Sequence, residues 1–309
     1  MSLQDRKEAF SLLASRFENT KVSDLLLEHK IPNSLKKWLH SSVFIYVSKC
    51  LPGDELYLDE NSLMNALVEN YDKDKIPNMT PNGMLVPKKY LVLEYNQLVR
   101  SFAAIIDSLN IRDLISSWHI PLNLRFKAGE VNESNMVRHH PTEHIHSDSW
   151  AGESSESVTI QIPIFGDIKN NHVSFYDPPD DFEESWLGPR SSYEDGSDIA
   201  NRYSKVNFVP NKGHLQFSDF AGLHASTRLP NAGPRLSIDT TFVIKKPNDN
   251  RSPETIHKWR EGERAMPNLL SNLGSDSLLY FPHGMNEFVD SEGGFKHPSN
   301  LKVIDLVNS

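Results

Sequence analysis

The sequence predicts a mainly β protein whose first third is helical. Residues 1–120 place apolar side chains at helical spacing in the segments 4–17 and 95–118. From residue 121 to residue 246 the pattern changes to short runs of strand-forming residues separated by Gly, Pro, Asn and Asp. Many short strands with such turn residues are typical of a sandwich or barrel, and we expect the helices to pack on its sheet.

In the helical part, one apolar stripe runs from Phe10 to Phe17 and a second from Leu98 to Leu109. Between them, residues 44–51 (FIYVSKCL) predict a strand. The β part contains seven predicted strands: LNLRF (122–126), TEHIHSD (142–148), VTIQIPI (158–164), HVSFYD (172–177), VNFVP (206–210), GHLQFSD (213–219) and RLSIDTTFVI (235–244).

The interval 177–205 has no strand pattern, and a loop of that length is usually functional, so we expect it to be a mobile lid. Ser252 as N-cap and Pro253 at the first helical position begin a predicted C-terminal helix within 247–309, which ends in a Gly-, Asn- and Ser-rich tail. We expect one domain over 1–309.

Composition excludes several functions. The chain has 309 residues, with 32 Lys and Arg against 41 Asp and Glu, and its net charge of −9 argues against a general nucleic-acid binder. The one cysteine, Cys50, excludes an intramolecular disulfide and a thiolate zinc site. No leader-like N-terminus and no run of about 18 apolar residues is present, so we expect a soluble cytoplasmic protein. Peripheral membrane contact and oligomeric state stay open.

Two histidines and an aspartate alternate along EHIHSDSW, residues 143–150. On a strand, His144, His146 and Asp148 would share one face. His224 lies 76 residues after Asp148, just beyond a predicted strand, and could supply a third ligand. Two histidines and one carboxylate with open positions are the ligand set of non-haem iron(II) oxygenases. An H-x-D motif alone is a weak signal, because it occurs by chance in many chains.

A second pattern follows eleven residues after His224. Arg235 and Ser237 would lie on one face of a strand, with Leu236 and Ile238 on the other. A buried arginine is costly unless it meets an anion, so an inward Arg-x-Ser beside a metal would suit a distal carboxylate. An arginine at the surface of an edge strand is the simpler alternative.

With these residues the sequence resembles the iron(II)/2-oxoglutarate-dependent dioxygenases. The likeness is carried by HSD at 146–148, LH at 223–224 and RLS at 235–237, all within 121–246. It implies a double-stranded β-helix (jelly-roll) core, with N-terminal helices packed on the major sheet.

The same resemblance implies roles for single residues. His146, Asp148 and His224 would bind Fe(II), while Arg235 and Ser237 would bind the C5 carboxylate of the co-substrate 2-oxoglutarate. The reaction would release succinate and CO2, and a carboxylate ligand favours hydroxylation or desaturation over halogenation.

Other candidates have two interpretations each. Arg125 could face the cavity toward a carboxylate or pair with an acid, and Thr159 could contact 2-oxoglutarate or face solvent. Trp150 could wall the pocket or belong to the core, and His144 is expected near the site without binding metal. Possible substrate contacts are Arg138, His139 and His140.

For the substrate we expect a small, anionic metabolite or sugar. The cations near the motif strands that could gather at a cavity mouth are Arg138, Arg190, Arg202, Lys205, Lys212 and Arg228. Layout and length are similar to hydroxylases of the sugar 3-deoxy-D-manno-octulosonic acid (Kdo). A cupin-type metal isomerase, a sugar-binding barrel and a barrel that lost catalysis remain alternatives, although Glu153 is too far from His146 for the usual cupin spacing.

Overall fold

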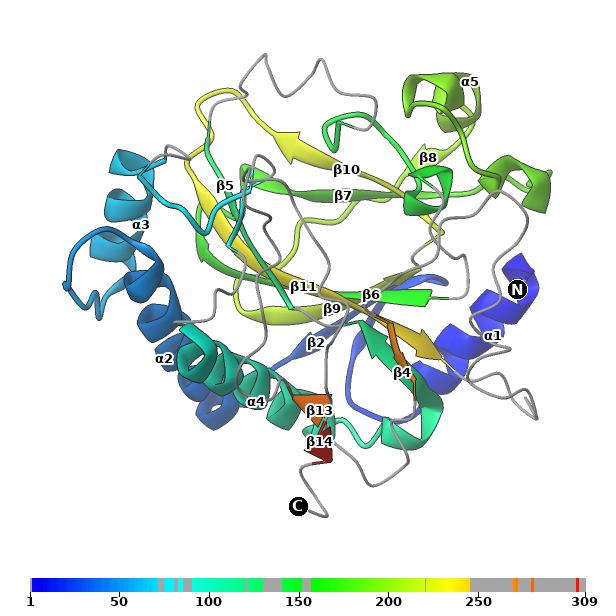
Figure 1. Ribbon diagram of the computed structural model, residues 1–309. Helices are drawn as coiled ribbons and strands as arrows, with labels where there is room; N and C mark the ends of the chain where they lie inside the picture. The colour runs from blue at the N-terminus through cyan, green and yellow to red at the C-terminus, as the bar shows by residue number, and fades with distance from the viewer. Residues whose placement is uncertain are drawn as a thin grey trace.

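The computed structural model (Figure 1) describes residues 2–71, 75–80, 83–85, 91–119, 122–129, 141–151, 157–219 and 221–244, and three short strands beyond them. The helices are α1 (Leu3–Ala14), α2 (Asn33–Cys50), α3 (Glu60–Glu69), α4 (Val92–Ser108) and α5 (Ser197–Ala200). The strands are β1 (Thr20–Ser23), β2 (Leu26–Lys30), β3 (Met84–Leu85), β4 (Ile115–His119), β5 (Asn123–Lys127), β6 (Ser157–Gly166), β7 (Asn171–Asp177), β8 (Ser204–Lys205), β9 (His214–Asp219), β10 (Leu223–Arg228), β11 (Arg235–Ile244), β12 (Leu269–Ser271), β13 (Leu279–Tyr280) and β14 (Ile304–Asp305).

A nine-stranded antiparallel sheet forms the centre of the molecule. Its strand order is β1-β2-β9-β6-β11-β4-β12, with β5 beside the first half of β11 and β3 beside β5. The ten-residue strand β11 pairs with β6 along nearly its whole length. One face of this sheet is buried under helices. The register of β11 therefore decides which of its side chains point to the helices and which point to the other face.

A second antiparallel sheet, β10-β7-β8, faces the large sheet (Figure 1). Strands β10 and β7 pair over six residues, which places His224 opposite Phe175. The protein is therefore mainly β with helices, as the sequence predicts.

Helices α2, α3 and α4 cover the face of the large sheet that points away from the small sheet (Figure 1). On β11, Leu236 and Ile238 are fully buried in the core formed with these helices. Burial of each such side chain stabilises the fold by about 1.5–3 kcal/mol. Since strand residues alternate, Arg235 and Ser237 point to the opposite face, toward the small sheet.

Two predicted elements of the first third were wrong. Residues 44–50 of the predicted strand belong to α2, where Leu39, Val43 and Tyr46 form a buried stripe at helical spacing. The short window 44–51 was too narrow to show that period. The predicted helix over 95–118 ends at Ser108, because Asn110 adopts a left-handed conformation (φ 57°), and Ile115 begins strand β4.

Other differences concern strands. Residues 206–210 lie outside the ladders, while β1, β2 and β10 were not predicted. Because β1 and β2 join the large sheet, the first third is more than a helical support. The interval 177–205 contains two 3₁₀ helices (Glu184–Leu187 and Glu194–Gly196), followed by helix α5 and strand β8. The predicted C-terminal helix and tail, 247–309, lie outside the described residues apart from β12, β13 and β14.

Within the described part of the chain, no helix combines the length and the apolar character needed to cross a membrane.

Candidate functional site

His146 and His224 are brought together by a pair of backbone hydrogen bonds. The His146 amide donates to the His224 carbonyl at 3.0 Å, and the His224 amide donates back at 2.8 Å. His224 lies on β10, and the Ser226 amide extends the pairing to the Thr142 carbonyl at 2.8 Å. A short ladder to β10 therefore holds the loop that carries His146.

The second ring nitrogen of each histidine is fixed by a backbone carbonyl. Nδ1 of His146 lies 2.7 Å from the His144 carbonyl, and Nδ1 of His224 lies 3.2 Å from the Gly222 carbonyl. Because a carbonyl only accepts hydrogen bonds, each neutral ring carries its proton on Nδ1. Nε2 of each ring then carries the lone pair, as in histidines that bind metal.

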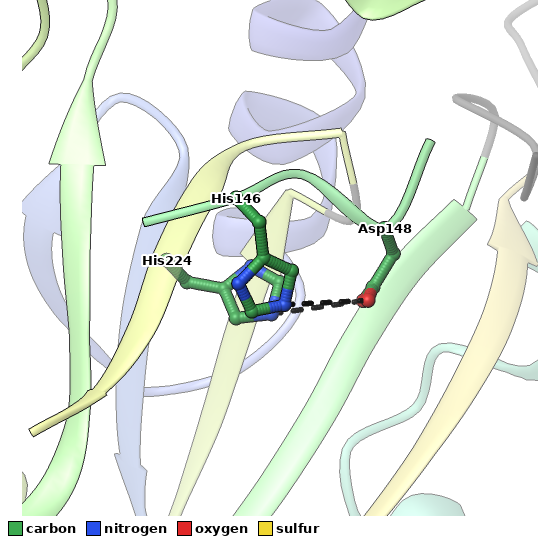
Figure 2. A group of neighbouring side chains, drawn as sticks. All are labelled: His146, Asp148 and His224. Atoms are coloured by element: carbon green, nitrogen blue, oxygen red, sulfur yellow. Dashed lines mark ion pairs between the residues drawn. The ribbon is translucent and has the colours of Figure 1, made fainter. Parts of the chain in front are cut away.

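Both Nε2 atoms face the carboxylate of Asp148 (Figure 2). His146 Nε2 lies 3.8 Å from Asp148 Oδ1, and His224 Nε2 lies 3.7 Å from Asp148 Oδ2. The three ligand atoms lie within 4.8 Å of one another and could hold a metal ion. His146 is buried, whereas the side chains of Asp148 and His224 are 30% and 23% exposed. One side of this group is thus open, as a metal with free coordination positions requires.

The predicted strand over 142–148 was wrong, although two of its alternating residues do converge. The segment makes a turn, and Asp148 begins a 3₁₀ helix that ends at Ala151. His144 contributes its carbonyl to His146 rather than a ring to the group. Residues 138–140 lie outside the described part of the chain.

A cavity of about 120 Å³ extends from this group between the two sheets. It is lined from the large sheet by Arg125, Lys127, Thr159, Gln161, Ser218, Arg235 and Asp239, from the small sheet by Val173, Phe175, His224 and Ser226, and from the loop by Thr142, His146 and Asp148. Arg125 and Thr159 therefore both reach the cavity. Trp150 is fully buried and does not line it.

Arg235 is the most unusual group in this cavity. Its side chain is buried, and so is that of Ser237, two residues along the same strand face. Among the described residues, Arg235 Nε and the Ser237 hydroxyl have no hydrogen-bond partner, and Asp239 is the carboxylate whose charge acts on Arg235. Burial, and then the neighbouring Arg125, lower the pKa of Arg235 to about 10, so the group still carries its charge at neutral pH.

Lys127 lies directly opposite Arg235 in the ladder of β5 and β11. It donates to Thr142 Oγ1 at 3.1 Å, and its Nζ lies 3.8 Å from Glu143. Burial is the main cause that lowers the pKa of Lys127 to about 7, with Arg125 adding to it. A cation that is half ionised at neutral pH thus stands beside one that is fully ionised.

Arg125 lines the cavity and also pairs with an acid. Its Nε pairs with Asp239 at 3.2 Å, and Asn123 donates to the same carboxylate at 2.8 Å. The Arg125 side chain is still 20% exposed at the cavity wall. Arg228 is paired as well, because it donates to Glu143 at 3.0 Å.

The interval 177–205 packs against the His146 end of the site. The Tyr193 ring stacks on the His146 ring with 4.0 Å between centroids, and Trp150 Nε1 donates to the Trp186 carbonyl at 2.7 Å. A Cβ at Gly196 would lie 2.2 Å from the Trp150 ring, so glycine is needed for this close approach. This interval therefore contributes a wall behind the metal-binding group.

The predicted gathering of cations at the mouth is not what the described residues show. Arg202 pairs with Asp181, and Lys212 pairs with Glu60. Arg190 packs on the Trp150 ring and donates to carbonyls. Long side chains find local acidic or aromatic partners, which spacing in the sequence does not reveal.

Sequence reasoning missed Lys127, Asp239 and Tyr193. Lys127 follows Arg125 by two residues on one strand, so the period of a strand could have identified it. Asp239 follows Ser237 in the same way. Tyr193 gave no signal, because its contact depends on how an irregular segment folds back.

Comparison with known proteins finds likeness in structure alone. No protein-family model and no curated protein matches the chain. Solved structures similar to it include the non-heme alpha-ketoglutarate-dependent carbocyclase SnoK of nogalamycin biosynthesis, at 12% identity and a TM-score of 0.41, covering 88% of this chain and 97% of that one. The non-heme alpha-ketoglutarate-dependent epimerase SnoN of the same biosynthesis has 12% identity and a TM-score of 0.40. The match covers 85% of this chain and 94% of that one. EctD from S. alaskensis, solved with 2-oxoglutarate and 5-hydroxyectoine, has 13% identity and a TM-score of 0.37, covering 86% of each chain.

Proposed function

We propose that the protein is an iron(II)- and 2-oxoglutarate-dependent dioxygenase with a double-stranded β-helix core. The observation that carries this proposal is Arg235, a buried cation whose Nε has no hydrogen-bond partner among the described residues, in the cavity that begins at His146, Asp148 and His224. A buried charge of this kind is costly unless a ligand supplies the counter-charge. The cavity thus suits a ligand with an anionic group at Arg235, beside a metal ion held by His146, Asp148 and His224.

The charges suit a dianion. The cations around the buried end are Arg125, Lys127, Arg228 and Arg235, against the carboxylates Glu143 and Asp239. The three arginines are charged and Lys127, with a pKa of about 7, is half ionised at neutral pH. The positive charge around this end therefore exceeds the negative charge of the two carboxylates by between one and two units. A dicarboxylate would use part of this excess at one end and contact the metal with its other end.

His146, Asp148 and His224 fit Fe(II) through two Nε2 atoms and a carboxylate oxygen. When bound, the iron supplies a site for dioxygen, and 2-oxoglutarate is oxidatively decarboxylated to succinate and CO2. The carbonyls of His144 and Gly222 hold the two rings in the tautomer that exposes Nε2.

Arg235 and Ser237 would hold the distal carboxylate of the co-substrate. A guanidinium gives two parallel, charge-assisted hydrogen bonds to a carboxylate, and the burial of this end excludes competing water. Thr159 and Arg125 would complete the wall near the keto acid. Tyr193 would shield the His146 ring from solvent.

For the substrate we propose a small molecule, with an anionic metabolite or sugar such as Kdo as the first class to screen. Each compound would be incubated with the iron-loaded protein, dioxygen and 2-oxoglutarate. Succinate release stimulated by one compound, with that compound gaining an oxygen atom, would identify it.

The test of the family is an anaerobic titration of the metal-free protein with Fe(II) and then 2-oxoglutarate. A visible charge-transfer absorption that needs both, and that saturates at one equivalent of each, is expected. A cupin-type isomerase would bind the metal without this absorption. Its absence in a protein that binds Fe(II) would refute the proposal.

A further inference from the structure

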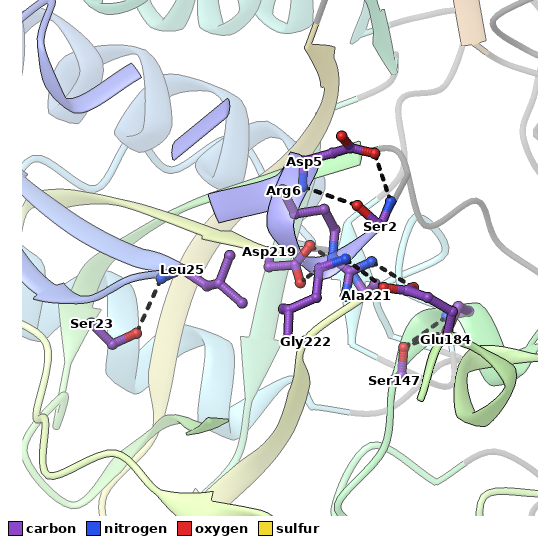
Figure 3. Close-up of polar contacts among 12 residues, drawn as sticks. Ser2, Asp5, Arg6, Ser23, Leu25, Ser147, Glu184, Asp219, Ala221 and Gly222 are labelled. Atoms are coloured by element: carbon purple, nitrogen blue, oxygen red, sulfur yellow. Dashed lines mark hydrogen bonds and ion pairs between the residues drawn. The ribbon is translucent and has the colours of Figure 1, made fainter. Parts of the chain in front are cut away.

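We propose that Arg6, on α1, is a positioning residue for the metal centre, acting on the supports of His224 and Asp148 at the same time. The proposal rests on the proposed function only in requiring that His146, Asp148 and His224 bind a metal. Arg6 is 4% exposed and lies between the end of β9 and the interval 177–205 (Figure 3). It belongs to the helix that is first in the chain, far from the motifs in sequence.

The first arm leads from Arg6 to His224. Arg6 Nε donates to Asp219 Oδ2 at 3.0 Å. The other carboxylate oxygen accepts from the Ala221 amide at 3.3 Å, and the Asp219 carbonyl accepts from the Gly222 amide at 3.0 Å. The Gly222 carbonyl in turn accepts from Nδ1 of His224 at 3.2 Å. Asp219 therefore organises the turn that sets the orientation of the His224 ring.

Asp219 cannot do this without a counter-charge. Its side chain is 3% exposed, and burial raises the pKa of its carboxyl, whereas the positive charge of Arg6 opposes that rise. Removing one partner of a buried pair leaves a buried charge without its counter-ion, which is strongly destabilising. The geometry of the turn thus depends on Arg6.

The second arm leads from Arg6 to Asp148. Arg6 Nη1 pairs with Glu184 Oε2 at 3.1 Å, and the Leu3 amide donates to the other oxygen of this carboxylate. Glu184 begins the 3₁₀ helix that includes Trp186. The Trp186 carbonyl accepts from Trp150, which shares the 3₁₀ helix Asp148–Ala151 with Asp148.

The two arms use two nitrogens of the guanidinium. Nε contacts the carboxylate of Asp219 and Nη1 that of Glu184, so the planar fork bridges the end of β9 and the 3₁₀ helix that begins at Glu184. The ammonium of lysine would keep the charge but not this geometry. The Arg6 guanidinium also lies over the Phe182 ring, 5.7 Å from its centroid. This is a second contact between Arg6 and the interval 177–205.

Lys7 provides a matched control on the same helix. It pairs with Asp24 at 3.2 Å, but both side chains are exposed, by 38% and 52%. An exposed pair contributes little to stability, and neither Lys7 nor Asp24 lines the cavity. Lys7→Met therefore removes a charge from α1 without disturbing either arm.

The experiment measures Co(II) binding to the metal-free protein, without 2-oxoglutarate, by the visible absorption of the bound ion. This absorption reports the geometry of the ligands and does not depend on catalysis. Arg6→Met is expected to weaken Co(II) binding about tenfold and to change the spectrum, because outer partners of metal ligands typically contribute ten- to a hundredfold. Lys7→Met should match the wild type in both.

Glu184→Gln separates the two arms. It should speed proteolytic cleavage within 177–205 while leaving the Co(II) spectrum closer to wild type than Arg6→Met does. If Arg6→Met does not fold, Arg6→Lys decides, with weaker Co(II) binding expected in a protein whose circular dichroism is native.

The outcomes are distinct. Wild-type Co(II) affinity and spectrum in a folded Arg6→Met protein (or in Arg6→Lys, where that variant decides) would overturn the role of Arg6 and leave the proposed function standing. A wild-type protein that binds no Co(II) would instead refute the proposed metal centre, and the role of Arg6 with it.

Discussion

At the open end of the cavity two histidines face a carboxylate, whereas at the buried end the Nε of Arg235 has no hydrogen-bond partner among the described residues. His146, Asp148 and His224 form a satisfied group with solvent on one side. Arg235 is buried and carries a charge that Asp239 only partly offsets, since Arg125 uses that carboxylate.

The difference shows which end is the better indicator of a ligand. Histidine and aspartate side chains can pair for structural reasons, so the group at the open end alone is compatible with several functions. A buried arginine whose charge is only partly offset is harder to explain by structure alone, because its burial costs free energy that a bound anion would offset. The buried end therefore predicts the class of ligand, and the open end predicts the chemistry.

The largest effect is expected at the open end. Alanine at His146, Asp148 or His224 should abolish iron binding, because each supplies one of the three ligands that the described residues offer. His144→Ala is the control, since only its backbone carbonyl supports the site. Iron content of the folded, purified variants is the measurement. Iron retained by His224→Ala, or lost from His144→Ala, would overturn the assignment.

At the buried end, Arg235→Met should weaken 2-oxoglutarate binding by roughly ten- to over a hundredfold while iron stays bound. The physical reason is the loss of a charge-assisted contact worth about 1.5–3 kcal/mol. Ser237→Ala should have a smaller effect, because the charge remains. The measurement is the affinity for 2-oxoglutarate from an anaerobic titration, together with the iron content of each variant.

The same variant should be at least as stable to heat as the wild type when no ligand is present. Replacing a buried, unpaired charge with an apolar side chain removes its desolvation cost. A much lower melting temperature for ligand-free Arg235→Met would show that Arg235 has a structural partner, and it would weaken the comparison between the two ends.

Lys127 should make co-substrate binding depend on pH. Its pKa is about 7 in the free protein, beside the cations Arg125, Arg228 and Arg235 and the carboxylate Glu143, and a bound anion would raise it. Below pH 7 lysine is already protonated, so affinity should be constant. Above pH 7 binding must take up a proton, and affinity should fall by up to about tenfold per pH unit.

Lys127→Met tests this linkage directly. The variant should bind 2-oxoglutarate more weakly at pH 6 than the wild type and should lose most of the slope between pH 7 and pH 9. A slope that the two proteins share would come from groups other than Lys127. Identical profiles for both would exclude Lys127 from the anion site.

The smallest effect concerns the interval 177–205, which we expect to act as a lid. Its contacts through Tyr193 and Trp186 are local, so binding of substrate should protect it from limited proteolysis by only a few-fold. Equal cleavage with and without substrate, together with full activity after the interval is shortened, would remove the lid.

The site was more predictable from the sequence than the fold around it. Arg235, Ser237 and the Leu236 and Ile238 side chains follow the period of a strand, and the structure places the two pairs on opposite faces as predicted. His146, Asp148 and His224 do converge, but through a turn and a short ladder to β10 rather than the predicted strand.

What the sequence could not predict depends on long-range contacts. Arg6 meets Asp219 across 213 residues, and the Tyr193 ring reaches His146 from an irregular segment. Such pairs have no local period, because tertiary packing alone selects them. The helix over 44–50 was missed for the opposite reason, since its period is visible only in the longer segment that starts at Asn33.

One measurement tests directly whether the cavity holds a dicarboxylate between metal and Arg235. The affinities of 2-oxoglutarate and of 2-oxobutyrate, which lacks the distal carboxylate, are compared in the iron-loaded wild type and in Arg235→Met under anaerobic conditions. The wild type should prefer 2-oxoglutarate by roughly ten- to over a hundredfold, and Arg235→Met should lose most of that preference. An equal preference in both proteins would contradict the account, because the distal carboxylate would then bind elsewhere.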